Sequence, residues 1–588
     1  PRGRVAAIMK FVASAFLVLF VRHTFALAPS SPMTMSEMTP QRPDIVIVGG
    51  GSAGLTAAKF GARFGKDVML VEKARLGGDC TWTGCVPSKA LIAAAKHAHA
   101  VRTARAFGVV VEGGGEVSVD WAALKARMKR TIQRIYDEDD SPEALRKLGV
   151  TVVEGAASFL DEDGTLLVET TPTKAEGLPK GQEATASTAL LVKPKYGVVV
   201  ATGARPVIPS SLLGSADKKS RGGGLFITYE QVFELEEQPK KMTIIGGGPI
   251  GCEIAQAFQR LGTAVTLVAP SLLPGEDPAA GEVLERVFAK EGVRVLKGRA
   301  VGAVASNSAA SNEPQRSEKV LVTVETTTPP KTTSSSTPSP PRNGEASEAD
   351  MVEVGADVVL VAVGREAVVD SLNLASARVD IATAPLSPGV LVNSQLRTSN
   401  KRVYAAGDCV SGAMQFTHVA GFQGAIAARN LLLPLSDKGF LSTPPPACTF
   451  TSPEVARVGL SEAQARLKFD KQNDGGGQDS AVATLVRPLS MVDRALCHDD
   501  DPEGFLKIVY RKKDGAILGA LVVSPCAGEL ASELGVAIAA KLTLPTLASV
   551  MHAYPSYAIA IQQMAAEVYY DTLEKSMPLY NKLKNLGL

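Results

Sequence analysis

The stretch Asp44-Ile-Val-Ile-Val-Gly-Gly-Gly-Ser-Ala-Gly54 decides how the first part of this chain folds. Its apolar residues predict a buried strand, its glycines predict a tight turn, and a helical pattern follows before Val68-Met-Leu-Val-Glu72. A strand, a glycine-rich turn, a helix and a second strand form the unit that places a diphosphate at a helix N-terminus. Glu72 lies about 20 residues past the turn, where a carboxylate can hold a ribose hydroxyl.

A second segment repeats this pattern. Met242-Thr-Ile-Ile245 is followed by Gly246-Gly-Gly-Pro-Ile-Gly251, a helical pattern and Val265-Thr-Leu-Val268. One glycine turn alone is a weak signal, but two in the same context predict two nucleotide sites. The residues that we expect to contact the nucleotides are Gly49, Gly51, Ser52, Ala53, Gly54, Glu72 and Lys73 in the first copy, and Gly246, Gly248, Ile250, Gly251 and Ala269 in the second.

Ala269 occupies the place of the acidic residue in the second copy. Without a carboxylate there, a 2′-phosphate is not repelled, which favours NADPH over NADH. No arginine stands beside Ala269 to bind that phosphate, so NADH stays open.

Two cysteines follow the first turn, in Leu76-Gly-Gly-Asp-Cys-Thr-Trp-Thr-Gly-Cys-Val-Pro-Ser-Lys89. A regular helix would separate their Cα atoms by roughly 7.5 Å along its axis, whereas a disulfide requires about 7 Å or less. We therefore expect an irregular segment between Cys80 and Cys85, with Gly84 supplying the conformational freedom. From spacing alone, half of a zinc site, a structural disulfide and a redox-active dithiol all stay open. No second ligand pair follows, so we predict no metal site, and the neighbouring nucleotide turn favours the redox dithiol.

The composition indicates a globular protein. The chain has 588 residues, of which 45% are hydrophobic and 21% charged, enough for several domains with their own cores. The formal net charge of +2 gives no electrostatic reason to expect a nucleic-acid partner. The remaining cysteines are scattered, and most are expected to be buried apolar residues: Cys252, Cys409, Cys448, Cys497 and Cys526.

Residues 1–43 are expected to be a targeting presequence. Lys10 precedes an apolar run from Phe11 to Val21, which is shorter than the about 20 residues of a membrane span and suits the core of a signal peptide. The Ser-, Thr- and Pro-rich segment from Phe25 resembles the two-part plastid presequence of algae with secondary plastids. Secretion and mitochondrial import are the alternatives. No other run is long and apolar enough to span a membrane.

Three polar stretches interrupt the predicted domains. Thr170–Thr188 and Lys471–Asp479 are expected to be surface loops. Ser306–Glu348 is rich in Ser, Thr and Pro, and such a composition buries too little apolar surface to offset the entropy lost on ordering. We expect residues 306–348 to form a disordered loop between strands.

With these features in place, the chain from about Asp44 to about Tyr570 resembles the pyridine nucleotide-disulfide oxidoreductases, which include glutathione reductase, dihydrolipoamide dehydrogenase and mercuric reductase. Three further motifs carry the resemblance: Val200-Ala-Thr-Gly-Ala204, Val361-Ala-Val-Gly-Arg365 and Val403-Tyr-Ala-Ala-Gly-Asp408. The resemblance implies an α/β fold with two Rossmann-like nucleotide-binding domains and a C-terminal α/β dimerisation domain. It implies a homodimer that uses FAD and NADPH or NADH. The expected domains are a FAD-binding domain with the dithiol at 44–240, an NAD(P)-binding domain at 241–363, a second FAD-binding segment at 364–443 and the dimerisation domain at 444–588.

The resemblance also implies roles for single residues. Electrons pass from NAD(P)H through FAD to a Cys80–Cys85 disulfide, with Cys85 next to the flavin and Cys80 attacking the substrate. Lys89 pairs with Glu253 beside the flavin, and Asp408 bonds the ribityl chain. Further cofactor contacts are expected from Gly78, Asp79, Lys89, Ala201, Thr202, Gly203, Gly364, Arg365 and Gly407.

The C-terminal motif His552-Ala-Tyr-Pro-Ser-Tyr-Ala-Ile559 departs from the family's common form. Tyr554 stands where a catalytic histidine is expected, Ile559 stands where its glutamate is expected, and His552 is two positions early. A tyrosine with a pKa of about 10 cannot act as a base near neutrality. Mercuric reductase resembles this arrangement better, so we expect a small soft or redox-active electron acceptor. A low-molecular-weight disulfide, with His552 reaching the site, and a dihydrolipoamide dehydrogenase-like component are the alternatives.

Overall fold

The computed structural model describes residues 38–112, 117–170, 188–212, 226–305, 320–326, 350–383, 387–470 and 480–585. The expected presequence up to residue 37 and the inserts at 171–187 and 471–479 lie outside the described residues. Gln41, inside the expected presequence, belongs to the folded domain instead. Its backbone N–H donates to the Leu191 carbonyl over 2.9 Å, and it forms a parallel bridge with Val192.

The first nucleotide-binding domain is built on a sheet that has seven strands among the described residues, in the order β18-β6-β1-β2-β3-β4-β5. Its first five strands are parallel, and β4 and β5 continue it as an antiparallel meander. Every residue of β1 is buried, as its unbroken apolar run predicts. The strands are β1 (Ile45–Val48), β2 (Val68–Glu72), β3 (Val150–Phe159), β4 (Leu166–Thr170), β5 (Ala189–Val192), β6 (Gly197–Val200) and β18 (Val403–Ala405).

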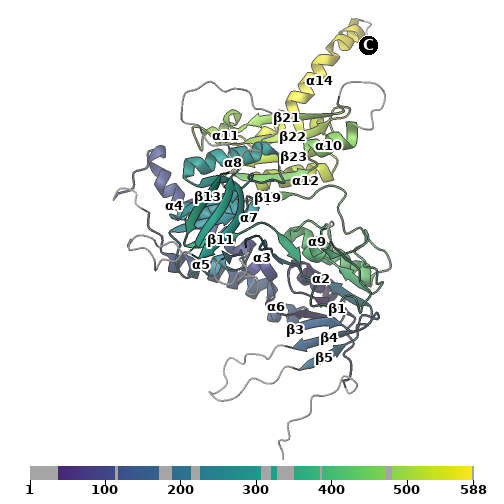
Figure 1. The fold of residues 1–588 in the computed structure, drawn as a ribbon. Coiled ribbons are helices and arrows are strands. Elements are labelled where there is room, and N and C mark those ends of the chain that lie inside the picture. The colour runs from purple at the N-terminus through teal and green to yellow at the C-terminus, as the bar shows by residue number, and fades with distance from the viewer. Residues whose placement is uncertain are drawn as a thin grey trace, which may run out of the picture.

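Two helices from distant parts of the sequence lie side by side in this domain (Figure 1). They are α2 (Ser52–Arg63), which follows the first glycine turn, and α9 (Thr417–Leu432). Their contact is so close that a Cβ atom added to Gly424 would lie 2.0 Å from the carbonyl oxygen of Ala53. The second FAD-binding segment is thereby joined to the first.

The second nucleotide-binding domain repeats the plan, with the described strands in the order β13-β12-β11-β10-β9-β14-β8. Its helices are α7 (Pro249–Leu261) and α8 (Pro278–Glu291). The strands are β8 (Phe226–Ile227), β9 (Lys241–Ile245), β10 (Ala264–Ala269), β11 (Arg294–Ala305), β12 (Val320–Thr326), β13 (Met351–Ala356) and β14 (Val358–Val361).

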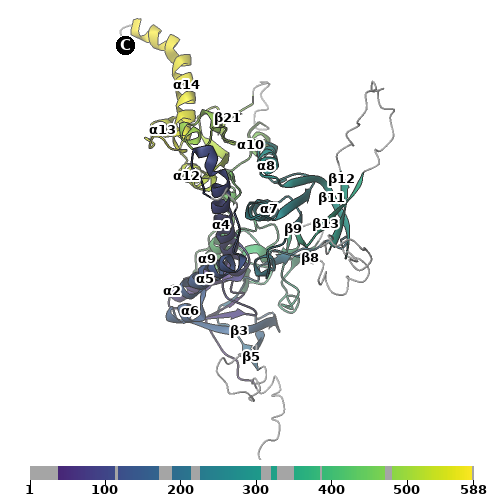
Figure 2. The ribbon, with the colours of Figure 1, turned by 90° about the vertical axis from the view of Figure 1, so that its left-hand side faces the viewer.

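The expectation of a disordered loop over the whole of 306–348 is wrong at β12. This strand pairs antiparallel with both β11 and β13, and the three strands form an arm at the side of the molecule (Figure 2). Alternate residues Val320, Val322 and Val324 are buried, which is the pattern of a strand with one face in the core. The rest of the insert lies outside the described residues.

The C-terminal domain contains an antiparallel sheet that has five strands among the described residues, in the order β19-β20-β23-β22-β21. The last helix, α14 (Ile559–Asn585), extends away from the body of this domain (Figures 1 and 2). The remaining elements are β19 (Ala447–Thr449), β20 (Glu454–Gly459), β21 (Val482–Pro488), β22 (Phe505–Arg511), β23 (Ile517–Ser524), α10 (Glu462–Phe469), α11 (Asp493–Leu496), α12 (Ala527–Ala539) and α13 (Leu544–Ala548).

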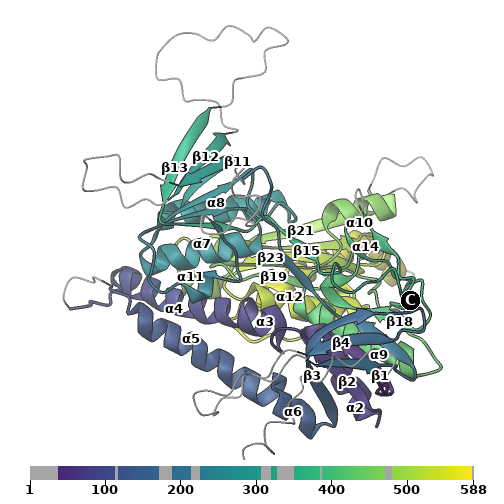
Figure 3. The ribbon, with the colours of Figure 1, turned by 60° about the horizontal axis from the view of Figure 1, so that its bottom comes forward.

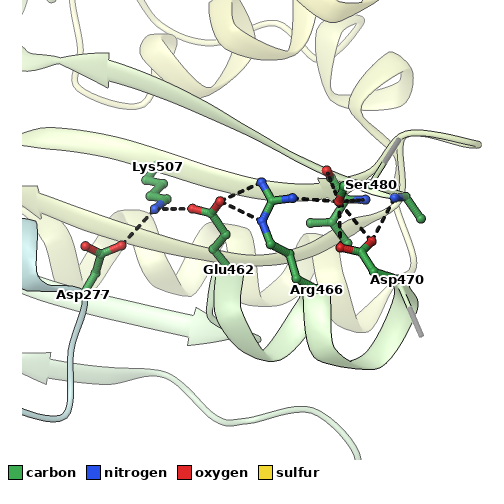
Figure 4. Close-up of polar contacts among 8 residues, drawn as sticks. Asp277, Glu462, Arg466, Asp470, Ser480 and Lys507 are labelled. Carbon is green, nitrogen blue, oxygen red and sulfur yellow. Dashed lines mark hydrogen bonds and ion pairs between the residues drawn. The ribbon is translucent and has the colours of Figure 1, made fainter. Parts of the chain in front are cut away.

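A chain of polar contacts attaches this domain to the second nucleotide-binding domain (Figure 4). Asp277, the residue that caps α8, accepts a hydrogen bond from Lys507 of β22 over 2.8 Å. Lys507 also lies 2.6 Å from Glu462, whose carboxylate accepts from Arg466. Because both carboxylates share one half-buried ammonium group, the position of α8 is coupled to that of α10.

The cysteine segment lies where the domains meet. It begins with α3 (Gly78–Trp82) and continues in the long α4 (Cys85–Thr103), which runs beside α5 (Trp121–Ile135) (Figure 3). A π-helical turn (Tyr136–Asp140) and α6 (Pro142–Lys147) follow α5. None of the described helices combines the length and apolar character of a membrane span.

Candidate active site

Residues from all three domains line a cavity of about 1620 Å³. The expected site residues that line it are Gly49, Gly51, Ser52, Ala53, Glu72, Lys73, Gly78, Asp79, Cys80, Cys85, Lys89, Ala201, Thr202, Gly203, Ile250, Glu253, Arg365, Gly407 and Asp408. Those that do not line it are Gly54, Gly246, Gly248, Gly251, Ala269, Gly364, His552 and Tyr554. The cavity thus joins the first glycine turn to the dithiol. The glycines of the second turn do not line it, but the N-terminal part of α7, which follows them, does.

The first glycine turn is closed tightly enough to require glycine. Gly49 has a φ of +106°, and a Cβ atom on it would lie 2.3 Å from the carbonyl oxygen of Ala201. A Cβ on Gly54 would lie 1.8 Å from the carbonyl oxygen of Gly49, so Gly54 closes the turn from inside. Glu72 accepts hydrogen bonds from the backbone N–H groups of Gly50 and Ala74 over 2.6 and 2.7 Å.

The N-terminus of α2 faces the cavity without a capping side chain. The first N–H groups of a helix have no partner within it, and together with the helix dipole they attract an anion. A diphosphate therefore fits the turn, and Glu72 at the cavity wall fits a ribose hydroxyl. These features match the adenosine diphosphate part of FAD.

The two cysteines lie on separate helices with a break between them. α3 ends at Trp82 and α4 begins at Cys85, as the expected irregularity requires. Gly84 is needed for close approach rather than for a positive φ, because its Cβ would lie 2.8 Å from the carbonyl oxygen of Asp79. Both cysteines are free thiols in this structure. The site therefore has the arrangement of the reduced dithiol.

The two thiols differ in their affinity for a proton. The hydrogen bond from Cys80 lowers the pKa of Cys85 to about 6, although burial opposes the charged form. The same hydrogen bond raises the pKa of Cys80, and burial raises it further. Near neutrality the pair therefore holds one proton, on Cys80, and one negative charge, on Cys85.

Lys89 and Glu253 form the expected ion pair over 2.9 Å. The second carboxylate oxygen of Glu253 accepts from the backbone N–H of Phe450 over 2.9 Å, and the Lys89 ammonium lies 4.2 Å from the centre of the Phe450 ring. Glu253 is buried, so its charge is compensated within the protein by one cation and one backbone donor.

A network around Arg365 includes a residue that the sequence did not single out. The Arg365 guanidinium donates to Asp408 and to Asp79, each over 2.6 Å, and to the Tyr229 hydroxyl over 3.0 Å. The Tyr229 hydroxyl in turn donates to Asp79 over 3.0 Å. Arg365 thus holds Asp408 at the cavity wall. Tyr229 is 150 residues from Asp79 in the sequence, so no local pattern predicts their contact.

The second glycine turn reproduces the geometry of the first. Gly246 has a φ of +120°, and its Cβ would lie 2.3 Å from the carbonyl oxygen of Ala362. Gly251 closes the turn against the carbonyl oxygen of Gly246, as Gly54 does against Gly49. The buried Ala269 side chain lies against Gly247, the counterpart of the Glu72 contact with Gly50. This match supports the expected ribose-side position of Ala269.

Ile559 offers no carboxylate at the position expected of the glutamate, but the structure pairs His552 with a carboxylate from another helix. Glu533 of α12 lies 2.7 Å from Nε2 of His552, while Nδ1 lies 3.0 Å from the carbonyl oxygen of Val550. Burial lowers the pKa of His552, but Glu533 and the Val550 carbonyl outweigh it and raise the pKa above its usual value. Both ring nitrogens are thus occupied, which fixes the imidazole in place.

Tyr554 is arranged differently. Its side chain is 67% exposed, and its hydroxyl donates to Asp493 over 2.8 Å. This hydrogen bond raises the pKa of Tyr554, so the phenol keeps its proton. Ile559 begins α14, and its side chain is apolar, while its backbone N–H donates to the Ser556 hydroxyl over 3.1 Å.

Comparisons with known proteins agree with this architecture. Residues 43–424 match the family described as pyridine nucleotide-disulphide oxidoreductase, and residues 445–565 match the dimerisation domain of that family. A dihydrolipoyl dehydrogenase from Geobacillus stearothermophilus is 30% identical over 532 residues, which cover 90% of this chain and 96% of that protein. A mercuric reductase from Lysinibacillus sphaericus is 30% identical over 524 residues, which cover 89% of this chain and 82% of that protein.

Solved structures show the same fold. LpdA from Mycobacterium tuberculosis matches with a TM-score of 0.69 at 26% identity, covering 90% of this chain and 99% of that one. The flavoprotein disulfide reductase RclA from Escherichia coli matches with a TM-score of 0.67 at 20% identity, covering 89% and 99%. The expected fold class, FAD and NAD(P)H cofactors and redox enzyme class are confirmed by these matches, and the dimerisation domain supports a homodimer. The chain belongs to the pyridine nucleotide-disulphide oxidoreductase family.

Proposed function

We propose that this enzyme passes electrons between NAD(P)H and a small disulfide substrate through the Cys80–Cys85 pair. When bound, FAD supplies the two-electron connection between the nicotinamide and the dithiol. The observation that carries the proposal is that the free thiols of Cys80 and Cys85 line the same cavity as the first glycine turn. Similarity to dihydrolipoyl dehydrogenases over most of the chain supports the choice of a disulfide.

The shared proton suits thiol–disulfide exchange. Movement of the proton from Cys80 to Cys85 makes Cys80 the attacking thiolate without exchange with solvent. Cys80 then forms a mixed disulfide with one half of the substrate, and the other half leaves as a thiolate that takes up a proton. Cys85, once deprotonated, attacks Cys80, which releases the second half and restores the Cys80–Cys85 disulfide.

The proton for the departing thiolate needs an acid. His552 is an imperfect candidate, because Glu533 and Val550 occupy both of its nitrogens. Tyr554 is exposed and lies in the dimerisation domain, so it is the second candidate acid, and donation of its proton to a substrate bound by a second subunit requires its hydroxyl to leave Asp493. A phenol is a weak acid, and we expect turnover of disulfides to be slower than with a free imidazole.

A soft metal ion or another redox-active acceptor is the second candidate. The exposed Tyr554 in place of a histidine and the relationship to mercuric reductase favour it. Soft ions prefer thiolate ligands, but binding between two thiolates requires the loss of the proton held by Cys80.

The test is oxidation of NADPH and NADH by the purified holoenzyme with oxidised lipoamide, glutathione disulfide, Hg(II), Cu(II) and quinones. The proposal expects the highest kcat/KM with one of the disulfides. Turnover with Hg(II) or Cu(II) and none with either disulfide would favour the second candidate.

A further inference from the structure

Asp140 is a buried carboxylate beside the helix that carries Cys80. It ends the π-helical turn Tyr136–Asp140 and is 9% exposed. Its Oδ2 atom accepts a hydrogen bond of 2.7 Å from the hydroxyl of Thr81, which is itself buried and directly follows Cys80 in α3. The contact joins residues 59 positions apart, so it is a feature of the tertiary structure.

The carboxylate also lies against the turn that leads into α3. Gly77 has a φ of +97°, and a Cβ atom on it would lie 3.0 Å from Oδ2 of Asp140. Burial raises the pKa of Asp140 above its usual value, and the Thr81 hydrogen bond and the more distant charge of Lys59 only partly oppose this shift. Among the described residues no lysine or arginine hydrogen bonds to this carboxylate, so its field is not cancelled at short range.

The surroundings of Cys85 contain a carboxylate that is paired with a cation. The Thr417 hydroxyl lies 3.4 Å from Cys85 Sγ, and Lys89 lies one turn further along α4. The Thr417 hydroxyl favours ionisation of both thiols, and the carboxylate on the Cys85 side, Glu253, is paired with Lys89 over 2.9 Å. The carboxylate on the Cys80 side, Asp140, has no such cation among the described residues. The pKa of Cys80 is raised mainly by the hydrogen bond with Cys85 and by burial, and the charge of Asp140 adds to these. The pKa of Cys85 is lowered mainly by the hydrogen bond from Cys80, and Thr417 and Lys89 add to it.

We propose that Asp140 is a positioning residue that keeps the negative charge of the reduced dithiol on Cys85 and off Cys80. It acts through its own charge, with Thr81 holding the carboxylate against α3. Reduction of the disulfide by two electrons with uptake of one proton leaves one thiol and one thiolate, so the reduced pair carries a charge that the oxidised pair lacks. Asp140 thereby selects the thiolate and also disfavours the reduced state. This inference rests on the dithiol chemistry of the proposed function, but not on the identity of the acceptor.

The test compares Asp140→Asn with Asp139→Asn in the reduced holoenzyme. Asparagine keeps the shape of Asp140 and its hydrogen bond to Thr81 but removes the charge. Asp139→Asn removes an equal charge at the neighbouring, exposed position and is the control. Both variants are treated with a limiting amount of iodoacetamide near neutral pH, and label at Cys80 and Cys85 is counted by peptide mass spectrometry. Asp140→Asn should raise the Cys80-to-Cys85 label ratio by about tenfold, the equivalent of one pKa unit, and Asp139→Asn should leave it unchanged.

Thr81→Val separates charge from position, because it removes the hydrogen bond and keeps the carboxylate. Its label ratio should stay near that of the wild type. An unchanged ratio in Asp140→Asn, or an equal rise in Asp140→Asn and Thr81→Val, would overturn the proposal. If Asp140→Asn does not yield folded holoenzyme, the wild type still decides, since comparable label on Cys80 and Cys85 contradicts a charge confined to Cys85. No acceptor takes part in this measurement, so a wrong substrate class would not affect it.

Discussion

The hydroxyl oxygen of Thr417 lies 3.4 Å from the Sγ atom of Cys85, although 332 residues separate them in the sequence. Cys85 is the first residue of α4, and Thr417 is the first residue of α9. The positive ends of two long helices therefore meet at one sulfur atom. Helix N-termini stabilise thiolates, so this arrangement and the Thr417 hydroxyl both favour the charged form of Cys85.

The first prediction concerns the titration of Cys85. In the reduced protein, alkylation of Cys85 should rise with pH around its pKa of about 6, because only the thiolate reacts. Thr417→Val removes one hydrogen bond to a charged group, worth about 1.5 kcal/mol, and should raise that pKa by about one unit. Thr417→Ser keeps the hydroxyl and should titrate like the wild type. Identical profiles for the valine and serine variants would show that the hydroxyl does not contact the thiolate.

The second prediction concerns the pair of Lys89 and Glu253. Lys89→Met leaves a buried carboxylate without its cation and should lower the free energy of unfolding by about 1–3 kcal/mol. Glu253→Gln keeps an acceptor for the Phe450 N–H, so the double variant should lose less than the sum of the single losses. Urea unfolding of the holoenzyme measures all four proteins. Additive losses would mean that the two charges are not coupled.

The third prediction concerns the choice of nicotinamide cofactor. Ala269 packs next to Gly247 in the second site in the same way that Glu72 packs next to Gly50 in the first. Ala269→Glu should therefore place a carboxylate beside the ribose of the nicotinamide cofactor. Repulsion of a 2′-phosphate by about 1–3 kcal/mol should lower kcat/KM for NADPH relative to NADH by about 5- to 150-fold. Steady-state kinetics with both cofactors measures the ratio, and Glu72→Gln, at the other nucleotide site, should leave it unchanged. An unaltered ratio in Ala269→Glu would place Ala269 away from the ribose.

The fourth prediction concerns the pH dependence that His552 contributes to stability. Its folded-state pKa is raised, so the stabilisation is fully present below the unfolded value of about 6.5 and is lost as pH rises through the folded value. The stability difference between the wild type and His552→Ala should therefore be largest in mild acid and shrink toward alkaline pH. Thermal unfolding across pH measures it. Tyr554→Phe changes an exposed group and should alter stability by no more than about 0.5 kcal/mol at any of these pH values.

The parts of the fold that could be predicted from sequence are those fixed by local pattern. The glycine turns lie between strand and helix as expected because Gly49 and Gly246 need positive φ values that other residues rarely adopt. The break between Cys80 and Cys85 followed from helix geometry alone. The strand β12 was missed because its run of alternating valines is short. The polar residues on both sides of that run favour a loop by their composition.

The contacts that were missed in the site are those between distant segments. Glu533 contacts His552 because α12 lies beside the C-terminal motif. The motif itself has Ile559 where a glutamate is expected, so the sequence gives no sign that a carboxylate reaches the imidazole from another helix. Tyr229 reaches Asp79 only once the second nucleotide-binding domain stands against the first. Such pairs depend on packing of whole domains, so periodicity and motif spacing carry no signal for them.

The most direct test of the account is capture of the substrate on Cys80. In Cys85→Ser the attacking thiol remains, but the mixed disulfide cannot be resolved, so glutathione disulfide, whose second half leaves as free glutathione, should leave a stable adduct on Cys80 that intact-mass and peptide spectrometry detect. The account predicts such an adduct in Cys85→Ser and none on the retained cysteine of Cys80→Ser. Absence of any adduct on Cys80, together with Hg(II)-dependent oxidation of NADPH or NADH by the wild type, would contradict it.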